Sequence, residues 1–458
     1  MRIPPKNTLR PIHTARATLL ALAFTTALHA PAHGQIIQRW LTQWGTSGED
    51  KGRGVTVDGA GQTWVTGDTR GALGGTNVGL VDLFLTPLSA AGVRGTSVQR
   101  GGAGVDQGLA VAVVGGSTVF GVGVTLTSPA WDGAAVIGGT DALAVRYNTA
   151  GIWQNTTRFG STGTDNAVGA AGNSTNLLVA GVSTGTMDGQ VQIGNGDAFL
   201  SKRSSTGALV WTRFVGTVQS DYGQAAAFDI AGNAYLAGST QGSLSGFTNA
   251  GNLGSGDLFL ARYDASGTQT LLKQWGTSGL DVVYAMTVDG SGNLYLTGTT
   301  NGVLGGQASS GGTDAFLTKL DSSGNVLWTR LLGGIGEDYS NGLALDAAGN
   351  VWIGGYTTGT FGGRTSAGGI DAYVALYDIT GNLLDTHFWG TSFDDLILGL
   401  AASPDGSVSL SGYTNGRLGA ASAGDYDAWA SSVIAVPEPT TAALLLGGTA
   451  FLALRRRR

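Results

Sequence analysis

Short apolar runs alternate with turn sequences along most of the chain, in the rhythm of β-strands. In one stretch, Tyr284–Val288 and Leu294–Gly298 flank the sequence Asp289–Asn293. Aspartate can accept bonds from a turn backbone and glycine supplies a positive φ, so this sequence indicates a hairpin. After a glycine-rich stretch come a third run, Asp314–Leu320, a second turn and a fourth run, Val326–Leu332. The pattern predicts four strands.

The same unit recurs seven times, with successive units 56 to 60 residues apart. Each unit begins with a glycine, which we call the head glycine: Gly45, Gly101, Gly160, Gly216, Gly276, Gly333 and Gly390. Five residues later stands a head aspartate: Asp50, Asp106, Asp165, Asp221, Asp281, Asp338 and Asp395. A third-strand aspartate also recurs: Asp82, Asp141, Asp197, Asp257, Asp314, Asp371 and Asp427. Short antiparallel four-stranded units of this length are typical of propeller blades. The sequence therefore predicts an all-β, seven-bladed β-propeller.

The two ends of the repeat region predict how the ring closes. The seventh unit stops after its third strand, near Ala428–Ala435. A strand without a unit of its own, Ile36–Trp44, precedes the first head glycine. We expect this N-terminal strand to complete the last blade, because that pairing removes two open sheet edges.

The repeat resembles a known bacterial family. Heads such as Trp44-Gly-Thr-Ser-Gly-Glu-Asp50, the Asp-x-x-Gly-Asn turns and the Asp-Ala-Phe-Leu strands are similar to the SBBP-type β-propeller repeat, over residues 36–435. The resemblance implies the propeller fold and an extracytoplasmic setting. It implies no shared reaction.

The first 34 residues have the features of a secretory signal peptide. They carry four basic residues and no acidic one, and contain an apolar stretch, Ala17–Leu28. That stretch is shorter than the ~20 residues that span a bilayer. Small residues at Ala32 and Gly34 predict cleavage between Gly34 and Gln35.

The other end resembles the bacterial PEP-CTERM sorting signal. The motif Pro437, Glu438 and Pro439 is followed by an apolar segment, residues 440–454, and by Arg455–Arg458. The resemblance implies processing by an exosortase-like protease in a Gram-negative bacterium, with release or anchoring afterwards; an ordinary tail anchor is the alternative. We therefore expect a signal peptide (1–34), a propeller (35–435) and a sorting tail (436–458). The resemblance further implies that the tail forms a helix that lies transiently in the inner membrane, and that the mature protein is in the cell envelope or outside the cell.

Composition excludes several classes of function. The two ends hold eight of the 25 basic residues and one of the 31 acidic ones, so the body is more acidic than the net charge of −6. Such a body repels nucleic acids. The chain has no cysteine and four histidines, of which three precede Gly34 and the fourth is His387. This excludes the usual Ser-His and Cys-His mechanisms and a histidine-based zinc site.

The head aspartates are the first candidate site. They precede what should be the innermost strand of each blade, so we expect them to form a carboxylate ring near one channel mouth. Such a ring could bind Ca²⁺, since hard cations take oxygen ligands. The alternative, which we favour, is that each aspartate caps its own loop or bonds a neighbouring blade. We expect no cofactor otherwise. Trp131, in an apparent insertion, is a candidate surface contact.

These features predict an exported, non-catalytic monomer that acts as a binding or scaffold protein. Its expected partners are the processing protease and an extracellular polysaccharide or another surface protein. The alternative is a polysaccharide lyase or glycosidase with carboxylates in the propeller channel. Catalysis needs a few unequal residues, whereas this chain repeats equivalent carboxylates.

Overall fold

The computed structural model describes residues 34–126, 135–251, 255–361 and 364–437. The chain separates into two units, of which Gly34–Val436 is one and the two terminal segments are the other. Residues 1–33 of the predicted signal peptide, Trp131, and Glu438 and Pro439 of the sorting motif lie outside the described residues.

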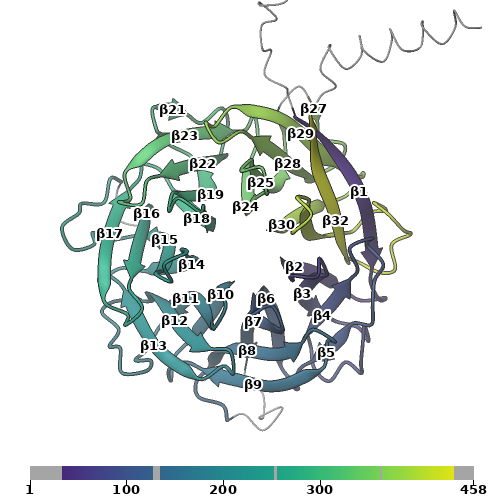
Figure 1. The fold of residues 1–458 in the computed structure, drawn as a ribbon, viewed down its shortest axis with the longest axis horizontal. Coiled ribbons are helices and arrows are strands. Elements are labelled where there is room, and N and C mark those ends of the chain that lie inside the picture. The colour runs from purple at the N-terminus through teal and green to yellow at the C-terminus, as the bar shows by residue number, and fades with distance from the viewer. Residues whose placement is uncertain (1–33, 127–134, 252–254, 362–363, 438–458) are drawn as a thin grey trace, which may run out of the picture. The chain divides into compact units, whose positions relative to one another are not determined.

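The unit Gly34–Val436 contains seven four-stranded antiparallel sheets, arranged as blades around an axis (Figure 1). Blade 1 has β2 (Asp50–Val57), β3 (Thr63–Thr69), β4 (Asp82–Leu88) and β5 (Val98–Arg100), and blade 2 has β6 (Val105–Val114), β7 (Thr118–Leu126), β8 (Thr140–Asn148) and β9 (Trp153–Phe159). Blade 3 has β10 (Asp165–Gly172), β11 (Asn176–Ser183), β12 (Asp197–Ser204) and β13 (Leu209–Val215), and blade 4 has β14 (Asp221–Phe228), β15 (Ala234–Thr240), β16 (Asp257–Tyr263) and β17 (Gln269–Trp275).

Blades 5 and 6 each carry an extra two-stranded hairpin. Blade 5 has β18 (Asp281–Val288), β19 (Leu294–Thr300), β22 (Asp314–Leu320) and β23 (Val326–Leu332), with the hairpin β20 (Val303–Leu304) and β21 (Gln307–Ala308). Blade 6 has β24 (Asp338–Leu345), β25 (Val351–Thr357), β28 (Asp371–Tyr377) and β29 (Leu383–Trp389), with the hairpin β26 (Thr360–Phe361) and β27 (Arg364–Thr365). Blade 7 has β30 (Asp395–Ala402), β31 (Val408–Thr414), β32 (Asp427–Pro437) and β1 (Gly34–Trp44). The predicted seven-bladed fold is confirmed.

The turn sequences act locally as their chemistry predicts. In blade 5, the Asp289 carboxylate accepts bonds from the backbone N–H groups of Ser291 (2.8 Å) and Asn293 (2.9 Å), and Gly292 has a φ of +83°. Glycine alone adopts this conformation without strain. The turn therefore fixes the register of the β18–β19 hairpin.

The core lies between blades, because both faces of each sheet are covered. Every residue of β19 and of β22 is buried. Leu258 and Leu260 of blade 4 pack in one cluster with Leu294 and Leu296 of blade 5. Burying such side chains contributes ~1.5–3 kcal/mol each. Each blade is thus stabilised mainly by its two neighbours.

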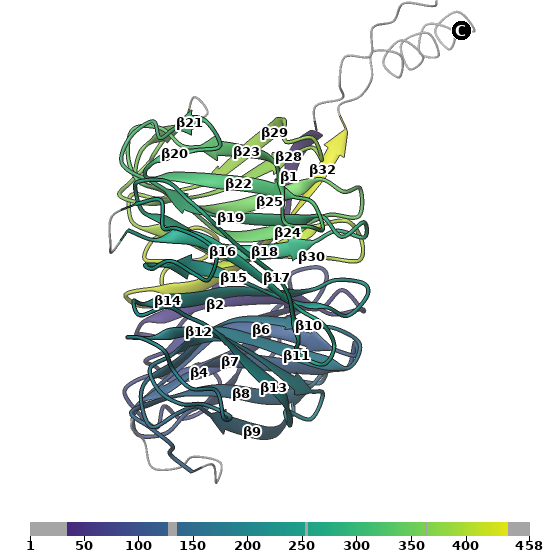
Figure 2. The same ribbon diagram turned by 90° about the vertical axis from the view of Figure 1, so that its left-hand side faces the viewer.

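The N-terminal strand closes the ring as predicted, because β1 pairs with β32 in blade 7. Figure 2 shows the two strands next to each other. The Ser431 hydroxyl donates to the Trp40 carbonyl (2.6 Å). β1 also contacts blade 6, where the Ile36 N–H donates to the Asp385 carboxylate (2.7 Å). β1, the first described strand, is thus bonded to both blade 7 and blade 6.

Candidate functional site

The head aspartates are buried and cap their own loops. Asp281 accepts bonds from the Thr277 N–H (2.6 Å) and from the Thr300 hydroxyl (2.5 Å). The equivalent loop N–H bonds to the head aspartate in the other six units: Thr46 to Asp50, Gly102 to Asp106, Ser161 to Asp165, Thr217 to Asp221, Gly334 to Asp338 and Thr391 to Asp395. All seven head aspartates are 0% exposed. They hold the segment that enters each inner strand.

Each head aspartate also lies beside the third-strand aspartate of the preceding blade. The Asp281 N–H donates to the carbonyl of Gly256, the residue before Asp257 (2.8 Å). A Cβ added to Gly276 would lie 2.6 Å from Asp257 Oδ1 and 2.9 Å from Asp281 Oδ2. We call each such set of two aspartates and one head glycine an inter-blade joint. Seven joints connect the seven blades.

The joints do not bring the seven carboxylates together, since each stays within its own loop. Among the described residues, no group of three or more acidic, histidine or cysteine side chains could hold a metal ion. Burial raises the pKa of six head aspartates: Asp50, Asp165, Asp221, Asp281, Asp338 and Asp395. Calcium binding at this ring stays a prediction.

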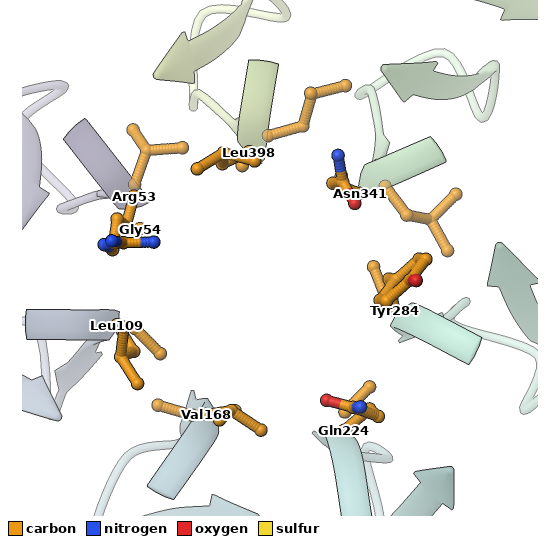
Figure 3. A pocket seen from close by; sticks show the side chains of 18 of the residues that line it. Arg53, Gly54, Leu109, Val168, Gln224, Tyr284, Asn341 and Leu398 are labelled. Carbon is orange, nitrogen blue, oxygen red and sulfur yellow. The ribbon is translucent and has the colours of Figure 1, made fainter. Parts of the chain in front are cut away.

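A different set of seven side chains surrounds the axis. In every blade, the register between first and second strand skips one residue, three positions after the head aspartate. A β-bulge of this kind re-aims one side chain. The bulge residues are Arg53, Leu109, Val168, Gln224, Tyr284, Asn341 and Leu398, and all seven line one pocket on the axis (Figure 3).

This axial pocket is small, and the side chains that line it differ from blade to blade. Its volume is ≈ 170 Å³, below the ~300–1,000 Å³ of pockets for drug-sized ligands. Gln224, Tyr284 and Asn341 form a neutral polar arc over blades 4 to 6, and Leu109 and Val168 form an apolar arc over blades 2 and 3. The pocket therefore offers hydrogen bonds on one side and apolar contact on the other.

The side chains that line the pocket carry little net charge. The Arg53 guanidinium is paired with the carboxylate of Asp68, which is 6% exposed. Burial raises the pKa of Tyr284 to about 12, so its phenol stays protonated at neutral pH. The Asn341 amide donates to the Ile397 carbonyl (3.2 Å), which fixes its orientation.

An arc of tyrosines continues from the pocket over blades 5 to 7. The ring centroids of Tyr284 and Tyr339 are 6.5 Å apart, and Tyr339 stacks on Tyr356 at 4.8 Å. Burial first, and then Tyr339, Tyr284 and Tyr413, raise the pKa of Tyr356. Tyr413 in turn contacts Tyr426 at 5.3 Å. We call these five residues the tyrosine arc, and all of them are partly exposed.

The comparison with known families matches two parts of the chain. A family described as a β-propeller repeat, SBBP, matches residues 273–305 and 327–362. A family described as the PEP-CTERM protein-sorting motif matches residues 435–458. No helix among the described residues is long and apolar enough to span a membrane.

More distant likenesses add little about activity. Regulatory protein FlaEY of Caulobacter vibrioides is 29% identical over 159 residues, and the match covers 31% of this chain and 17% of that protein. A hydrazine synthase of Kuenenia stuttgartiensis is 12% identical with a TM-score of 0.46, over 78% of this chain and 92% of that one. A fungal alcohol oxidase in complex with copper is 13% identical with a TM-score of 0.44, over 88% and 76%. None of these likenesses bears on activity.

The repeats, the propeller fold and the C-terminal motif together indicate the kind of protein to which this chain belongs. The units that match the propeller-repeat family are blades 5 and 6, and the other five blades share their strand order. The sorting motif implies export and processing by an exosortase. The chain therefore contains SBBP-type β-propeller repeats in blades 5 and 6 and ends in a PEP-CTERM sorting motif, which indicates an exported surface protein.

Proposed function

We propose that the protein is a non-catalytic binding protein of the cell surface or extracellular matrix, and that its axial pocket takes a neutral, hydroxyl-rich group such as the end or a side branch of a polysaccharide. The main support for this proposal is that the bulge residues differ from blade to blade, although the blades otherwise repeat the same pattern. Processing by the exosortase then releases or anchors the ring after the tail helix has held it transiently in the inner membrane.

The chemistry of the lining supports a saccharide. Amide and phenol groups exchange hydrogen bonds with hydroxyls, and aliphatic side chains pack against C–H faces. The paired Arg53 and the protonated Tyr284 leave little net charge to attract an ionic ligand. The tyrosine arc supplies amphipathic rings on which further sugar units can lie.

The catalytic alternative needs an acid and a base beside the ligand. Among the described residues that line the axial pocket, none is an aspartate, glutamate or histidine. The repeated carboxylates are placed in the joints, where loop backbone and neighbouring hydroxyls bind them. This distribution favours binding over cleavage.

Titration calorimetry with the host's own extracellular polysaccharide tests the proposal. We expect Gln224→Ala and Tyr284→Phe to weaken binding about 3- to 10-fold each, since one neutral hydrogen bond contributes ~0.5–1.5 kcal/mol. Tyr222→Phe is the matched control, because Tyr222 is on the same strand as Gln224 and is 39% exposed but does not line the pocket. Equal affinity in all three variants contradicts the proposed site. Appearance of new reducing ends during the titration favours the enzyme.

A further inference from the structure

The tyrosine arc already holds one ammonium group of the chain itself. Lys51 Nζ lies 4.6 Å from the ring centroid of Tyr426 and 5.4 Å from that of Tyr413. The same ammonium is 3.0 Å from the Glu49 carboxylate, which also pairs with Arg70. A cation within ~6 Å of a tyrosine ring is attracted by the electrons of its face. The boundary between blades 7 and 1 thus shows how this surface binds an ammonium group.

Blade 6 has the same parts without a cation. Glu337 directly precedes a head aspartate, as Glu49 does. Two positions further on, Tyr339 replaces Lys51, and alternate residues of an extended strand lie on one face. Tyr339 pairs with Tyr356 across β24 and β25, and their rings stack at 4.8 Å. Among the described residues, no lysine or arginine lies over either ring, so a cation for this surface must come from another molecule.

Two more carboxylates lie beside the arc. Asp394 precedes the head aspartate of blade 7, and its N–H accepts no carbonyl but donates to the side chain of Asn415 (2.8 Å), two residues after Tyr413. Asp425 directly precedes Tyr426. Burial first, and then negative charges that include those of Asp394 and Asp425, raise the pKa of Tyr426. Carboxylates thus accompany the arc from blade 6 to blade 7.

The chain does not neutralise these carboxylates. Glu337, Asp394 and Asp425 form no ion pair with any residue in the described part of the chain. Two basic residues that act on the arc, Lys51 and Arg53, are each paired with another carboxylate. The surface around the tyrosines is therefore negatively charged and complementary to a cation.

We propose that the tyrosine arc binds an amino-sugar polymer, whose protonated amines lie against these carboxylates while its sugar rings lie on the tyrosines. The inference rests on the proposed function, because Tyr284 belongs both to the axial pocket and to the arc (Figure 3). A polymer with a neutral end in the pocket can continue from Tyr284 to Tyr339, whose ring centroids are 6.5 Å apart. This continuity favours a sugar polymer over a basic peptide. Sugar C–H faces pack on the rings, and the amines supply the charge.

Titration calorimetry with two matched oligosaccharides tests the inference at about pH 6, where exposed carboxylates are charged. The glucosamine hexamer carries free amines, and the N-acetylglucosamine hexamer has the same backbone without charge. We expect the wild-type protein to bind the glucosamine hexamer about 5- to 10-fold more tightly, since each exposed ion pair contributes modestly. The difference should shrink at high salt, because salt screens exposed charges.

Two substitutions separate the charge of the arc from the charge of the whole protein. Glu337→Gln should weaken binding of the glucosamine hexamer about 2- to 5-fold and leave binding of the N-acetylglucosamine hexamer unchanged. Asp321→Asn is the matched control, because Glu337 bridges to Thr313 at one end of β22 whereas Asp321 follows the other end. Asn148 accepts the equivalent turn bonds in blade 2, so asparagine fits this turn. This control should change neither affinity.

A second pair of substitutions tests the rings. Tyr339→Leu should weaken binding of both hexamers about 3-fold, because the ring face is lost. Leucine is compatible with this position of the repeat, since Leu396 occupies it in blade 7. Tyr339→Phe keeps the ring and should keep most of the affinity.

The inference is overturned if both hexamers bind equally at low salt, or if Glu337→Gln and Asp321→Asn have the same effect. It is also overturned if a lysine hexapeptide binds as tightly as the glucosamine hexamer, because the arc then recognises a basic peptide. Gln224→Ala distinguishes this inference from the proposed pocket. If only Glu337→Gln weakens binding of the glucosamine hexamer, the arc stands and the pocket does not. If only Gln224→Ala weakens it, the pocket stands and the inference about the arc is wrong.

Discussion

The head glycine Gly276 is required by what faces it rather than by a left-handed backbone. At Gly276 the φ is not positive, yet an added Cβ would lie within 3.0 Å of both carboxylates of the joint. The paired aspartates therefore occupy the space of a side chain. The repeat pattern located these residues, but the reason for glycine required the positions of residues from two blades.

Replacement of this glycine should weaken one blade boundary. We expect Gly276→Ala to lower the free energy of unfolding by about 1–3 kcal/mol, because a methyl group is forced against packed atoms. Gly290→Ala is the control, since nothing lies within 4 Å of its added Cβ, and it should change stability by less than ~0.5 kcal/mol. Urea unfolding curves measure both, and similar values for the two variants contradict the role of the joint.

At the scale of elements, the apolar pattern predicted the strands. The closing strand was predicted from the number of strands at the two ends of the repeat region. The seventh unit lacked one strand and the N-terminus had one extra, and β1 does pair with β32. A bulge shifts the alternation of buried and partly exposed positions by one residue, as at Tyr284–Ala285 in β18, but a strand of eight residues is too short for its sequence alone to show that shift. Aligning the seven units at three residues after the head aspartate would have revealed Arg53, Gln224, Tyr284 and Asn341 as unequal.

Removal of the closing strand should open the ring. A chain that starts at Gly45 loses the burial of Ile36 and Trp44, each 5% exposed in the closed ring, and exposes the edge of β32. We expect a lower unfolding midpoint and self-association, because an unpaired edge strand pairs with other chains. Light scattering after size exclusion measures the association.

A peptide of residues 35–44 added in trans is the matched restoration. It should raise the midpoint of the shortened chain and reduce its self-association. A shortened chain that stays monomeric with an unchanged midpoint contradicts closure by β1.

At the scale of the whole molecule, the repeated residues and the unequal ones have different tasks. The aspartates that recur in every unit hold blades together, whereas the bulge residues, which differ from blade to blade, surround the axis. The unequal positions around the axis are mostly neutral side chains, so a comparison of carboxylates alone does not find them. The fold was therefore predictable, while the candidate pocket needed the register of each inner hairpin.

Export and processing are the central claim about this molecule, and intact mass tests it most directly. We would purify the protein from the cell and medium fractions of its native host and measure each mass. The account predicts one chain that begins at Gln35 and ends near Pro439. A membrane-bound chain that keeps Arg455–Arg458 would contradict it, because the tail would then be an anchor and not a processed sorting signal.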